Sequence, residues 1–356
     1  MSSTIPNQVP AWTYTAGYPH SLKLSNTPLP QTAANGHILV QIEACALNPV
    51  DIQMMNMPKW KYPSFLGGDM REKGTVMDFS GTVISSGSMD KFKEGDEVFG
   101  MTFVPFAPAG GSLAQVAHFN LATTPCVKKP AIWSFEQAAA ISLVWLTAKA
   151  CIDKVAPWVE KSSGKRVAVL GGSSSTGIYS IILAKWRGWK VVATSSGANK
   201  DFVTNHLKAD AHVDYTKQDV RKGVSDFQPD AVIDCVGGTE CIGLPSSKRY
   251  VSIVGDKTGR TAMGGPYTYY DVWHPLNAAT QWLRWAKGNL GLGEAYDVII
   301  LSPRSDYLED AIKTLSSEDI HIDSVHAFED AKKAFERLNT GRAKGKVVVK
   351  VQQATR

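Results

Sequence analysis

The sequence predicts an α/β protein in which a doubly wound parallel sheet is set between β-rich segments at the two ends of the chain. Glycine and proline punctuate short apolar stretches over residues 1–128, where helical periodicity is poor. Over residues 129–301, continuous apolar strands alternate with helical segments, which is typical of a parallel sheet covered on both faces. Over residues 302–356 this alternation stops.

The first segment carries three stretches that predict strands. They are His37–Leu47, Phe79–Gly87 and Asp96–Phe103. The first is almost continuously apolar, and turn-forming residues separate all three. We therefore expect an irregular, barrel-like β domain over residues 1–128.

The middle segment begins with a predicted helix over Ser134–Ile152. Ser134 is a residue type that caps helices, and Gln137 follows it at the spacing of a capping box. The β–α alternation then predicts strands over 165–170, 189–195, 211–215, 230–238, 248–255 and 296–301, with helices over 178–188 and 200–209. This segment, residues 129–301, is the predicted nucleotide-binding domain.

The last segment contains two amphipathic stretches and a final apolar stretch. The spacing predicts helices over 307–316 and 328–338 and a strand over 345–351. We expect residues 302–356 to be the C-terminal part of the β-rich domain that residues 1–128 begin.

Composition excludes several classes of protein. The chain of 356 residues is 44% hydrophobic and 20% charged, close to the globular average, which argues against disorder. A net charge of +5 is too small to indicate a nucleic-acid partner, and no run reaches the roughly 18 apolar residues of a membrane span. The N-terminus lacks the basic and apolar regions of a signal peptide, so we expect a cytoplasmic protein.

The cysteines follow no ligand pattern. They are Cys45, Cys126, Cys151, Cys235 and Cys241. None forms a C-x-x-C pair, and the odd count argues against a disulfide framework. We expect reduced thiols and no bound metal.

The sharpest motif is a small-residue turn between a predicted buried strand, which ends at Leu170, and a helix that starts near Ile178. Strand, turn and helix follow one another in the order that a dinucleotide site requires, although Ser174 replaces the middle glycine of the usual G-x-G-x-x-G. The candidate ligands are Gly172, Ser173, Ser174, Ser175, Thr176 and Gly177. Small residues let the backbone approach a pyrophosphate at the helix N-terminus. A plain strand-to-helix turn is the alternative interpretation.

The end of the second strand of this unit indicates which nucleotide binds. NAD sites place Asp or Glu there, about 20 residues past the turn, to hold the ribose 2′-hydroxyl. Residues 194–200 contain no carboxylate. The candidate 2′-phosphate ligands are Ser195, Ser196, Asn199 and Lys200, with Tyr215 at the end of the next strand for the adenosine. A lysine and hydroxyls suit a 2′-phosphate, so we predict NADPH. The alternative is that Lys200 is a solvated lysine at a helix start.

Several motifs carry a family resemblance that covers nearly the whole chain. They are ALNPVD (Ala46–Asp51), DFSGTV (Asp78–Val83), FKEGDEVFG (Phe92–Gly100), SFEQAAAISLVWLTA (Ser134–Ala148), DCVGG (Asp234–Gly238), SIVG (Ser252–Gly255) and GRAKGKVVVKV (Gly341–Val351). With them the chain resembles the medium-chain dehydrogenase/reductase superfamily, in its zinc-free quinone oxidoreductase (zeta-crystallin-like) branch. It also resembles fungal trans-acting enoyl reductases and the yeast and reticulon-interacting reductase-like proteins.

The resemblance implies both fold and chemistry. It implies a Rossmann sheet inserted into a discontinuous GroES-like catalytic domain, and hydride transfer from NADPH to a conjugated carbonyl substrate. The implied catalytic residues are Asn48, Asp51 and Thr147, with Asn48 as the donor to the developing oxyanion. The further implied cofactor residues are Val236, Gly237, Val254, Gly255, Gly345 and Lys346. The cysteines and the G-H-E motif of the zinc-dependent relatives are absent, so no metal is implied.

Three function classes stay open at this point. The first is an NADPH-dependent quinone or enone reductase. The second is an enoyl reductase acting in trans on a carrier-protein-bound acyl chain, with Lys59, Lys61 and Arg71 available for an acidic partner. The third is a cofactor-binding protein that acts by interaction, because Ile52 replaces the usual tyrosine and residues 259–293 are rich in aromatics. The oligomeric state is either a monomer or a homodimer.

Overall fold

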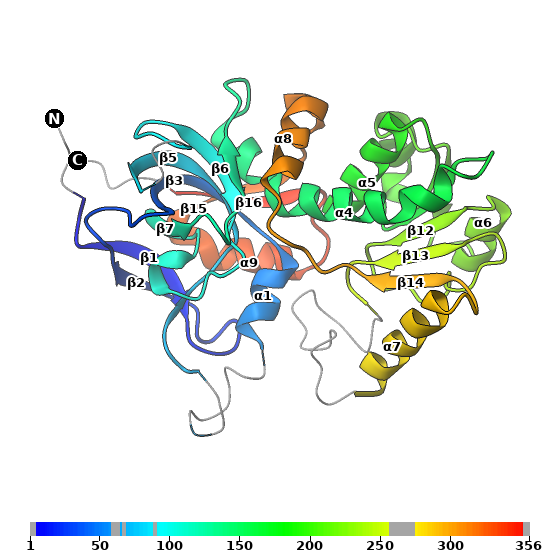
Figure 1. The fold of residues 1–356 in the computed structure, drawn as a ribbon, viewed down its shortest axis with the longest axis horizontal. Coiled ribbons are helices and arrows are strands. Elements are labelled where there is room, and N and C mark those ends of the chain that lie inside the picture. The colour runs from blue at the N-terminus through cyan, green and yellow to red at the C-terminus, as the bar shows by residue number, and fades with distance from the viewer. Residues whose placement is uncertain (1–4, 58–64, 66–68, 88–90, 256–274, 352–356) are drawn as a thin grey trace. The chain divides into compact units, whose positions relative to one another are not determined.

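The computed structural model describes residues 5–57, 65, 69–87, 91–255 and 275–351 (Figure 1). These residues form two compact units. The first contains the described residues up to Leu143 and those from Pro303 onward, and the second contains the described residues from Val144 to Ser302.

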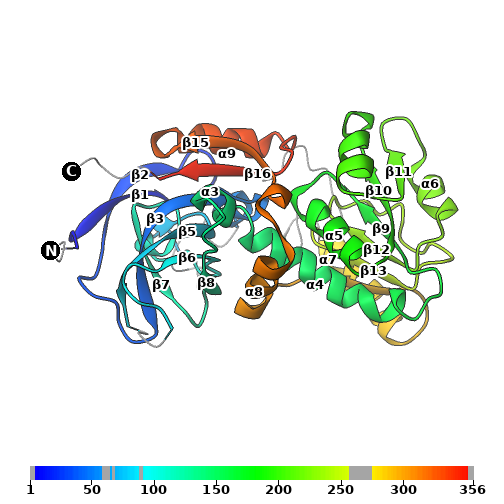
Figure 2. The same ribbon diagram turned by 90° about the horizontal axis from the view of Figure 1, so that it is seen from above.

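The first unit is built on a sheet that both ends of the chain share. Its order is β15-β16-β3-β5-β6-β8, and β7 also pairs with β3. The strands are β3 (His37–Leu47), β5 (Asp78–Ser86), β6 (Glu97–Met101), β7 (Val116–Asn120), β8 (Cys126–Lys128), β15 (Ile322–Ala327) and β16 (Lys346–Lys350). Pairing of β16 with β3, with Val347 opposite Leu47, joins the C-terminal strand to the first domain (Figure 2). The predicted fold class is confirmed, including the discontinuity.

A smaller sheet and several helices belong to the same unit. The sheet has the order β2-β1-β4, with β1 (Gln8–Tyr14), β2 (Lys23–Pro28) and β4 (Lys73–Gly74). The helices α1 (Pro49–Met55), α3 (Phe135–Ala139), α8 (Ser305–Thr314) and α9 (Ala331–Asn339) lie in it. In the core the rings of Phe79 and Phe119 stack at 4.3 Å, and Trp12 Nε1 donates to the Phe328 carbonyl at 2.9 Å. The second contact again ties the two ends of the chain together.

The predicted helix over 134–152 is two helices. Ser134 Oγ accepts from Gln137 N at 3.1 Å and Gln137 Oε1 accepts from Ser134 N at 2.9 Å, so the capping box is confirmed. The helix it begins, α3 (Phe135–Ala139), ends after five residues, and α4 (Ser142–Val159) follows.

The second unit contains a six-stranded sheet whose neighbouring strands are all parallel. The order is β11-β10-β9-β12-β13-β14 (Figures 1 and 2). The strands are β9 (Arg166–Leu170), β10 (Lys190–Ser195), β11 (Ala211–Asp214), β12 (Ala231–Asp234), β13 (Arg249–Ser252) and β14 (Ala295–Val298). Counted along the chain this is the order 3-2-1-4-5-6, which reverses between β9 and β12. In open α/β sheets, ligands bind outside the carboxyl ends of the strands at such a reversal.

Helices α5 (Ser175–Trp186), α6 (Val220–Asp226) and α7 (Pro275–Asn289) belong to this unit. The predicted helix over 200–209 is irregular: a 3₁₀ turn over Gly197–Asn199 precedes a π-helical turn over Phe202–His206. That turn holds Val203, Thr204 and Asn205, which all have low helix propensity.

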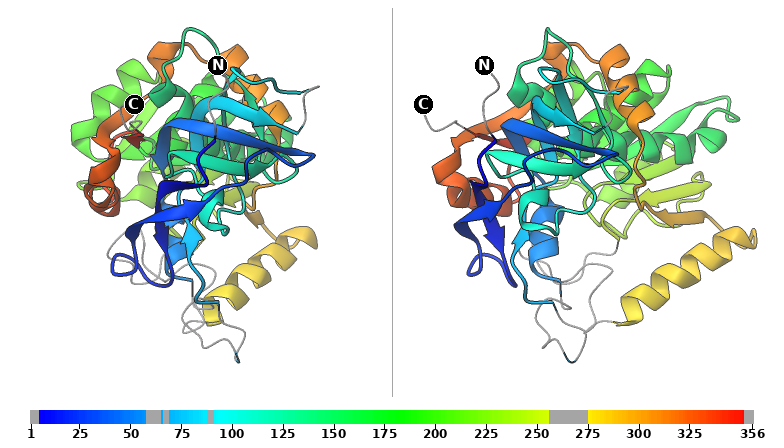
Figure 3. Two further views of the ribbon diagram at one scale, coloured as in Figure 1. Left: turned by 90° about the vertical axis from the view of Figure 1, so that its left-hand side faces the viewer. Right: turned by 60° about the vertical axis from the view of Figure 1, so that its left-hand side comes forward.

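Helix α7 (Figure 3) packs against β14, and its side chains Trp282 and Leu283 are more than half exposed. Gln281 is buried, and Gly288 approaches β14 so closely that a Cβ would lie 2.7 Å from Ala295 Cα. Of the aromatic residues in 259–293, Trp282 and Trp285 are exposed, whereas Tyr267, Tyr269, Tyr270 and Trp273 lie outside the described residues. Among the residues described, no helix is long and apolar enough to cross a membrane.

Candidate functional site

The small-residue turn follows β9, at the position where the strand order reverses. Gly171 has a φ of +81°, and a Cβ there would lie 2.3 Å from Val236 Cγ1. A Cβ at Gly177 would lie 2.2 Å from the Gly171 carbonyl oxygen. These contacts explain the glycines at both ends of the turn, because a side chain at either would push α5 or the β12 loop away from β9.

Ser174 begins α5. Its hydroxyl accepts a hydrogen bond from Gly177 N at 3.1 Å, which makes it the N-cap of the helix. The first-turn N–H groups of a helix have no intrahelical acceptors and carry a partial positive charge, so this end of α5 suits an anionic group.

A buried carboxylate organises the loops after β12 and β13. Asp234, only 1% exposed, accepts from Val236 N at 2.9 Å and Gly237 N at 2.8 Å. Ser252 Oγ donates to Asp234 at 2.8 Å and accepts from Gly255 N at 3.0 Å. Asp234 and Ser252 therefore hold together the loops that carry the cofactor residues predicted from DCVGG and SIVG. Neither of the two was itself predicted as a site residue. The signal was available: an acidic residue that ends a buried strand needs partners.

Burial raises the pKa of Asp234, and Ser252 with the backbone N–H groups of Val236, Gly237 and Gly238 acts in the opposite direction. Hydrogen bonds of this kind favour the charged form of a carboxyl. The network therefore holds the Asp234 carboxylate as a hydrogen-bond acceptor at the end of β12.

Asn199 links the loop after β10 to the turn after β9. Its Nδ2 donates to Ser173 Oγ at 3.2 Å and to Ser196 Oγ at 3.4 Å. Three of the predicted ligands thus share one hydrogen-bonded cluster, which joins the candidate pyrophosphate and 2′-phosphate segments.

The remaining predicted 2′-phosphate ligands differ in accessibility. Lys200 is exposed, and Tyr215 is 59% exposed. Ser195 is only 1% exposed, and its Oγ donates to the Ser196 carbonyl at 3.1 Å and lies 2.8 Å from His212 Nε2. Its hydroxyl is therefore engaged within the protein.

Asp214 places a carboxylate at this edge that sequence reasoning did not foresee. It ends β11 and stands opposite Ser195 in the parallel register. Its Oδ1 accepts from Thr216 N at 2.9 Å, and a hydrogen bond from Gly197 N also lowers its pKa, after the stronger effect of Thr216. The β10 end lacks an acidic residue, but the neighbouring strand supplies one.

A second buried cluster lies in the first unit, where β3, β5 and β16 meet. Lys346 Nζ pairs with Asp78 Oδ2 at 3.0 Å and also contacts Asn48 Oδ1. Asn48 Nδ2 donates to Asp78 Oδ2 at 2.9 Å and to the Ala46 carbonyl at 3.3 Å. All three side chains are at most 2% exposed. The predicted residues Asn48 and Lys346 therefore contact each other directly and share Asp78, a carboxylate that sequence reasoning had not assigned.

Asp51 completes this cluster at the start of α1. Its carboxylate accepts from Asn48 N at 2.7 Å and from Met77 N at 3.2 Å. Burial raises its pKa to about 7, and the charge of Asp78 acts in the same direction. Asp51 thus fixes the backbone of Asn48.

The other implied residues are placed as follows. Gly345 has a φ of +95°, and a Cβ there would lie 2.4 Å from the His321 carbonyl oxygen, so glycine is required before Lys346. Thr147 lies on α4 of the second unit and is 6% exposed. Arg71 is exposed and bonds Asp69 at 3.0 Å, while Lys59 and Lys61 lie outside the described residues.

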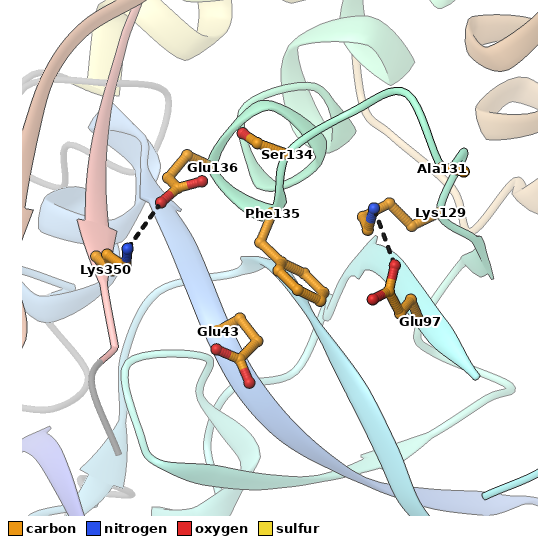
Figure 4. Close-up of a pocket in the computed structure, with 8 residues that line it drawn as sticks. All are labelled: Glu43, Glu97, Lys129, Ala131, Ser134, Phe135, Glu136 and Lys350. Carbon is orange, nitrogen blue, oxygen red and sulfur yellow. Dashed lines mark ion pairs between the residues drawn. The ribbon is translucent and has the colours of Figure 1, made fainter. Parts of the chain in front are cut away.

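A cleft of about 380 Å³ in the first unit has a charged lining (Figure 4). Lys129 pairs with Glu97 at 3.0 Å and Lys350 pairs with Glu136 at 3.6 Å, with the Phe135 ring between the two pairs. None of the predicted site residues lines it. Within the described part of the chain, no group of three or more His, Cys, Asp or Glu side chains is placed to hold a metal ion.

Comparisons with known proteins match both parts of the fold. Residues 34–131 match the family model of the alcohol dehydrogenase GroES-like domain, and residues 207–349 match that of the zinc-binding dehydrogenases.

Curated proteins and solved structures match over nearly the full length. The chain is 30% identical to the trans-enoyl reductase pgmF of Aspergillus terreus over 99% of either chain. It is 30% identical to the 2-methylene-furan-3-one reductase of Solanum lycopersicum over 98% of this chain and 80% of that protein. The structure of the quinone oxidoreductase from Coxiella burnetii is similar with a TM-score of 0.75, at 25% identity, over 97% of this chain and 100% of that one.

Proposed function

The chain belongs to the medium-chain dehydrogenase/reductase superfamily, whose members are oxidoreductases that use NAD(P) cofactors, and we propose that it transfers hydride from NADPH to a conjugated carbonyl acceptor, an enone or a quinone. The observation that carries this proposal is the turn at the reversal point of the parallel sheet, joined by Asn199 to a loop that bears Lys200. The names of the relatives support the acceptor class, because a methylene-furanone carries a carbon–carbon double bond conjugated to a ketone.

The described residues fit a dinucleotide. The turn between Gly171 and Gly177 keeps side chains away from the N-terminus of α5, whose N–H groups would bind the pyrophosphate. The loops held by Asp234 and Ser252 would border the rest of the cofactor at the same sheet edge. NADPH, when bound, supplies the hydride.

Asn48 is the proposed donor to the oxygen on which charge develops. Both amide hydrogens have acceptors, Asp78 at 2.9 Å and the Ala46 carbonyl at 3.3 Å. The longer bond is the weaker one, and we propose that Asn48 exchanges it for the substrate oxygen. Asp51 and Lys346 would then act by holding Asn48 in place, and Thr147 stays a predicted neighbour of the reacting atoms.

The test is NADPH oxidation, followed at 340 nm, against a panel of quinones and small enones. We expect turnover with one of these classes and weaker binding of NADH than of NADPH. Lys200→Ala should weaken NADPH binding and leave NADH binding unchanged. Its matched control is Lys190→Ala, an exposed lysine at the opposite end of β10. If wild type bound NADPH and NADH with equal affinity, and Lys200→Ala did the same, the NADPH assignment would be contradicted.

We also propose that the reaction needs no zinc. The support is the donor set, because the cysteines are buried and burial raises their pKa values, which disfavours the thiolate that zinc binds. Turnover should survive dialysis against a chelator. Loss of turnover that zinc alone restores would contradict this part of the proposal.

A second candidate is an enoyl reductase that acts in trans on a carrier-protein-bound acyl chain. The observation favouring it is the match with a trans-enoyl reductase over 99% of either chain. Turnover of α,β-unsaturated thioesters, with none on quinones or small enones, would establish it. NADPH binding without turnover of any acceptor would favour an interaction protein instead.

A further inference from the structure

His212 lies on β11, which ends the described strand order of the parallel sheet. Its Nε2 is 2.8 Å from Ser195 Oγ, at the start of the loop expected to hold the 2′-phosphate. Ser195 Oγ also lies 3.1 Å from the Ser196 carbonyl oxygen, so its hydroxyl can donate either to that carbonyl or to the imidazole, and the tautomer of His212 sets which.

Two charged groups act on this ring. Lys200, in the loop after β10, lowers the pKa of His212, and Asp214, two residues further along β11 on the same face, raises it. The other face of β11 is covered by α6, where Gly223 lies against Val213.

The charges of Lys200 and Asp214 cancel, and this matters for an anionic ligand. A 2′-phosphate carries up to two negative charges, and with His212 neutral the two charged side chains that act on it, Lys200 and Asp214, would present a net charge of zero. With His212 protonated, the same edge presents a net positive charge. Ser195, which is buried and already bonded, adds no charge of its own.

We propose that His212 is a specificity-determining residue for NADPH, a second cation that offsets Asp214 and favours the 2′-phosphate when it is protonated. This inference rests on the proposed use of NADPH. Its bond to Ser195 gives it a second, positioning role, because Ser195 leads directly into Ser196, which Asn199 ties to the turn after β9.

The direction of the pH effect follows from linkage. Burial is the largest cause that lowers the pKa of His212, so the ring is mostly neutral at neutral pH in the free protein. A bound 2′-phosphate favours the imidazolium, so binding takes up a proton. The contribution of His212 to the preference for NADP⁺ over NAD⁺ should therefore increase as the pH falls. It should vanish at high pH, where the ring is neutral.

The experiment measures dissociation constants of NADP⁺ and NAD⁺ by calorimetry between pH 5.5 and pH 8.5. The 2′-phosphate itself titrates with a pKa of about 6, so wild type is compared at each pH with His212→Gln, which keeps a donor but cannot be charged. At the acid end we expect His212→Gln to bind NADP⁺ about tenfold more weakly than wild type, the effect of one charge-assisted contact. NAD⁺ affinity should be the same in both, which also shows that the variant is folded.

Two further variants sharpen the test. His212→Lys carries a charge at every pH and should keep the preference for NADP⁺ up to pH 8.5. His206→Gln is the matched control, since His206 is exposed on the neighbouring π-helical turn and stacks on Phe202. Parallel NADP⁺ profiles in wild type and His212→Gln overturn this inference while leaving the use of NADPH intact. Failure of wild type to bind either nucleotide overturns the proposed function, and with it this inference.

Discussion

Ser252 Oγ donates a hydrogen bond of 2.8 Å to the Asp234 carboxylate, across the carboxyl ends of the neighbouring strands β12 and β13. Each residue also accepts backbone N–H groups of the loop that follows its own strand: Gly237 for Asp234 and Gly255 for Ser252. One hydroxyl therefore couples two loops that border the proposed cofactor site.

Ser252→Ala should weaken both folding and cofactor binding. A hydrogen bond to a charged group contributes about 1.5–3 kcal/mol, and its loss leaves the buried Asp234 with one donor fewer. We expect the free energy of unfolding in urea to fall by about that amount. The NADPH dissociation constant should rise, because the loop through Gly255 loses its anchor.

The control is Ser180→Ala on α5. Ser180 is fully buried in the same unit, and its hydroxyl has no hydrogen-bond partner among the described residues. Removing it should change neither stability nor binding by much. Equal losses in Ser252→Ala and Ser180→Ala would mean that the bond to Asp234 contributes nothing specific.

Ser174 offers a way to separate helix capping from anion binding. Ser174→Asn and Ser174→Asp both keep an oxygen that can accept from Gly177 N, so both should unfold within about 1 kcal/mol of wild type. Only the aspartate places a negative charge where the pyrophosphate is expected. We predict that Ser174→Asp binds NADPH at least tenfold more weakly than Ser174→Asn, measured by nucleotide fluorescence.

The matched cap in the first unit is Ser134, which accepts from Gln137 N at 3.1 Å. Ser134→Asp should leave NADPH affinity unchanged, because no cofactor is proposed at the start of α3. If Ser174→Asp bound NADPH as tightly as Ser174→Asn, the pyrophosphate would lie elsewhere.

The sequence predicted the elements that are specified by residues close together in the chain. The turn after β9 was recognisable because glycines and other small residues stand between an apolar strand and a helix. The capping-box pair Ser134 and Gln137 likewise predicted the start of a helix. Short elements escaped detection: β4 has two residues, β2 holds one apolar residue, Leu24, and Pro10 interrupts the apolar pattern of β1. Their pairing depends on partners far along the chain.

Site residues were predicted where they belong to a recognisable motif. They were missed where only strand pairing brings them to the site. Asp214 reaches the end of β10 because parallel register places it opposite Ser195, which local spacing cannot indicate. Asp78 meets Lys346, 268 positions further along the chain, because β5 and β16 both pair with β3. His212 was missed because a histidine within a short strand carries no motif.

The buried pair of Lys346 and Asp78 gives a prediction about stability. Their atoms are 3.0 Å apart and both side chains are at most 2% exposed. Lys346→Met leaves Asp78 without its cation, which should cost about 3–5 kcal/mol. Adding Asp78→Asn removes the unpaired charge, so the double variant should be more stable than Lys346→Met alone in urea unfolding.

The same double variant tests the role of Lys346 toward the cofactor. If it folds and binds NADPH as wild type does, Lys346 acts by holding Asn48, and a specific loss of affinity would show that its ammonium also reaches the cofactor. A double variant no more stable than the single one would show that Asp78 is not destabilised by losing its partner.

Asp51 makes stability depend on pH in a direction opposite to that of most carboxylates. Burial raises its folded-state pKa to about 7, above the ordinary value near 3.8. The folded protein therefore binds this proton more tightly than the unfolded chain does. The contribution to stability is complete below pH 3.8 and is lost as the pH rises through 7.

Asp51→Asn isolates this contribution. The variant keeps one acceptor oxygen, enough for the 2.7 Å bond from Asn48 N, but has no proton to lose. The difference in unfolding free energy, wild type minus variant, should fall by up to about 4 kcal/mol between pH 4 and pH 8. Urea unfolding at four or five pH values measures it. Parallel curves would contradict the raised pKa, whereas a difference that grows with pH would mean that Asp51 is ionised and paired in the folded protein.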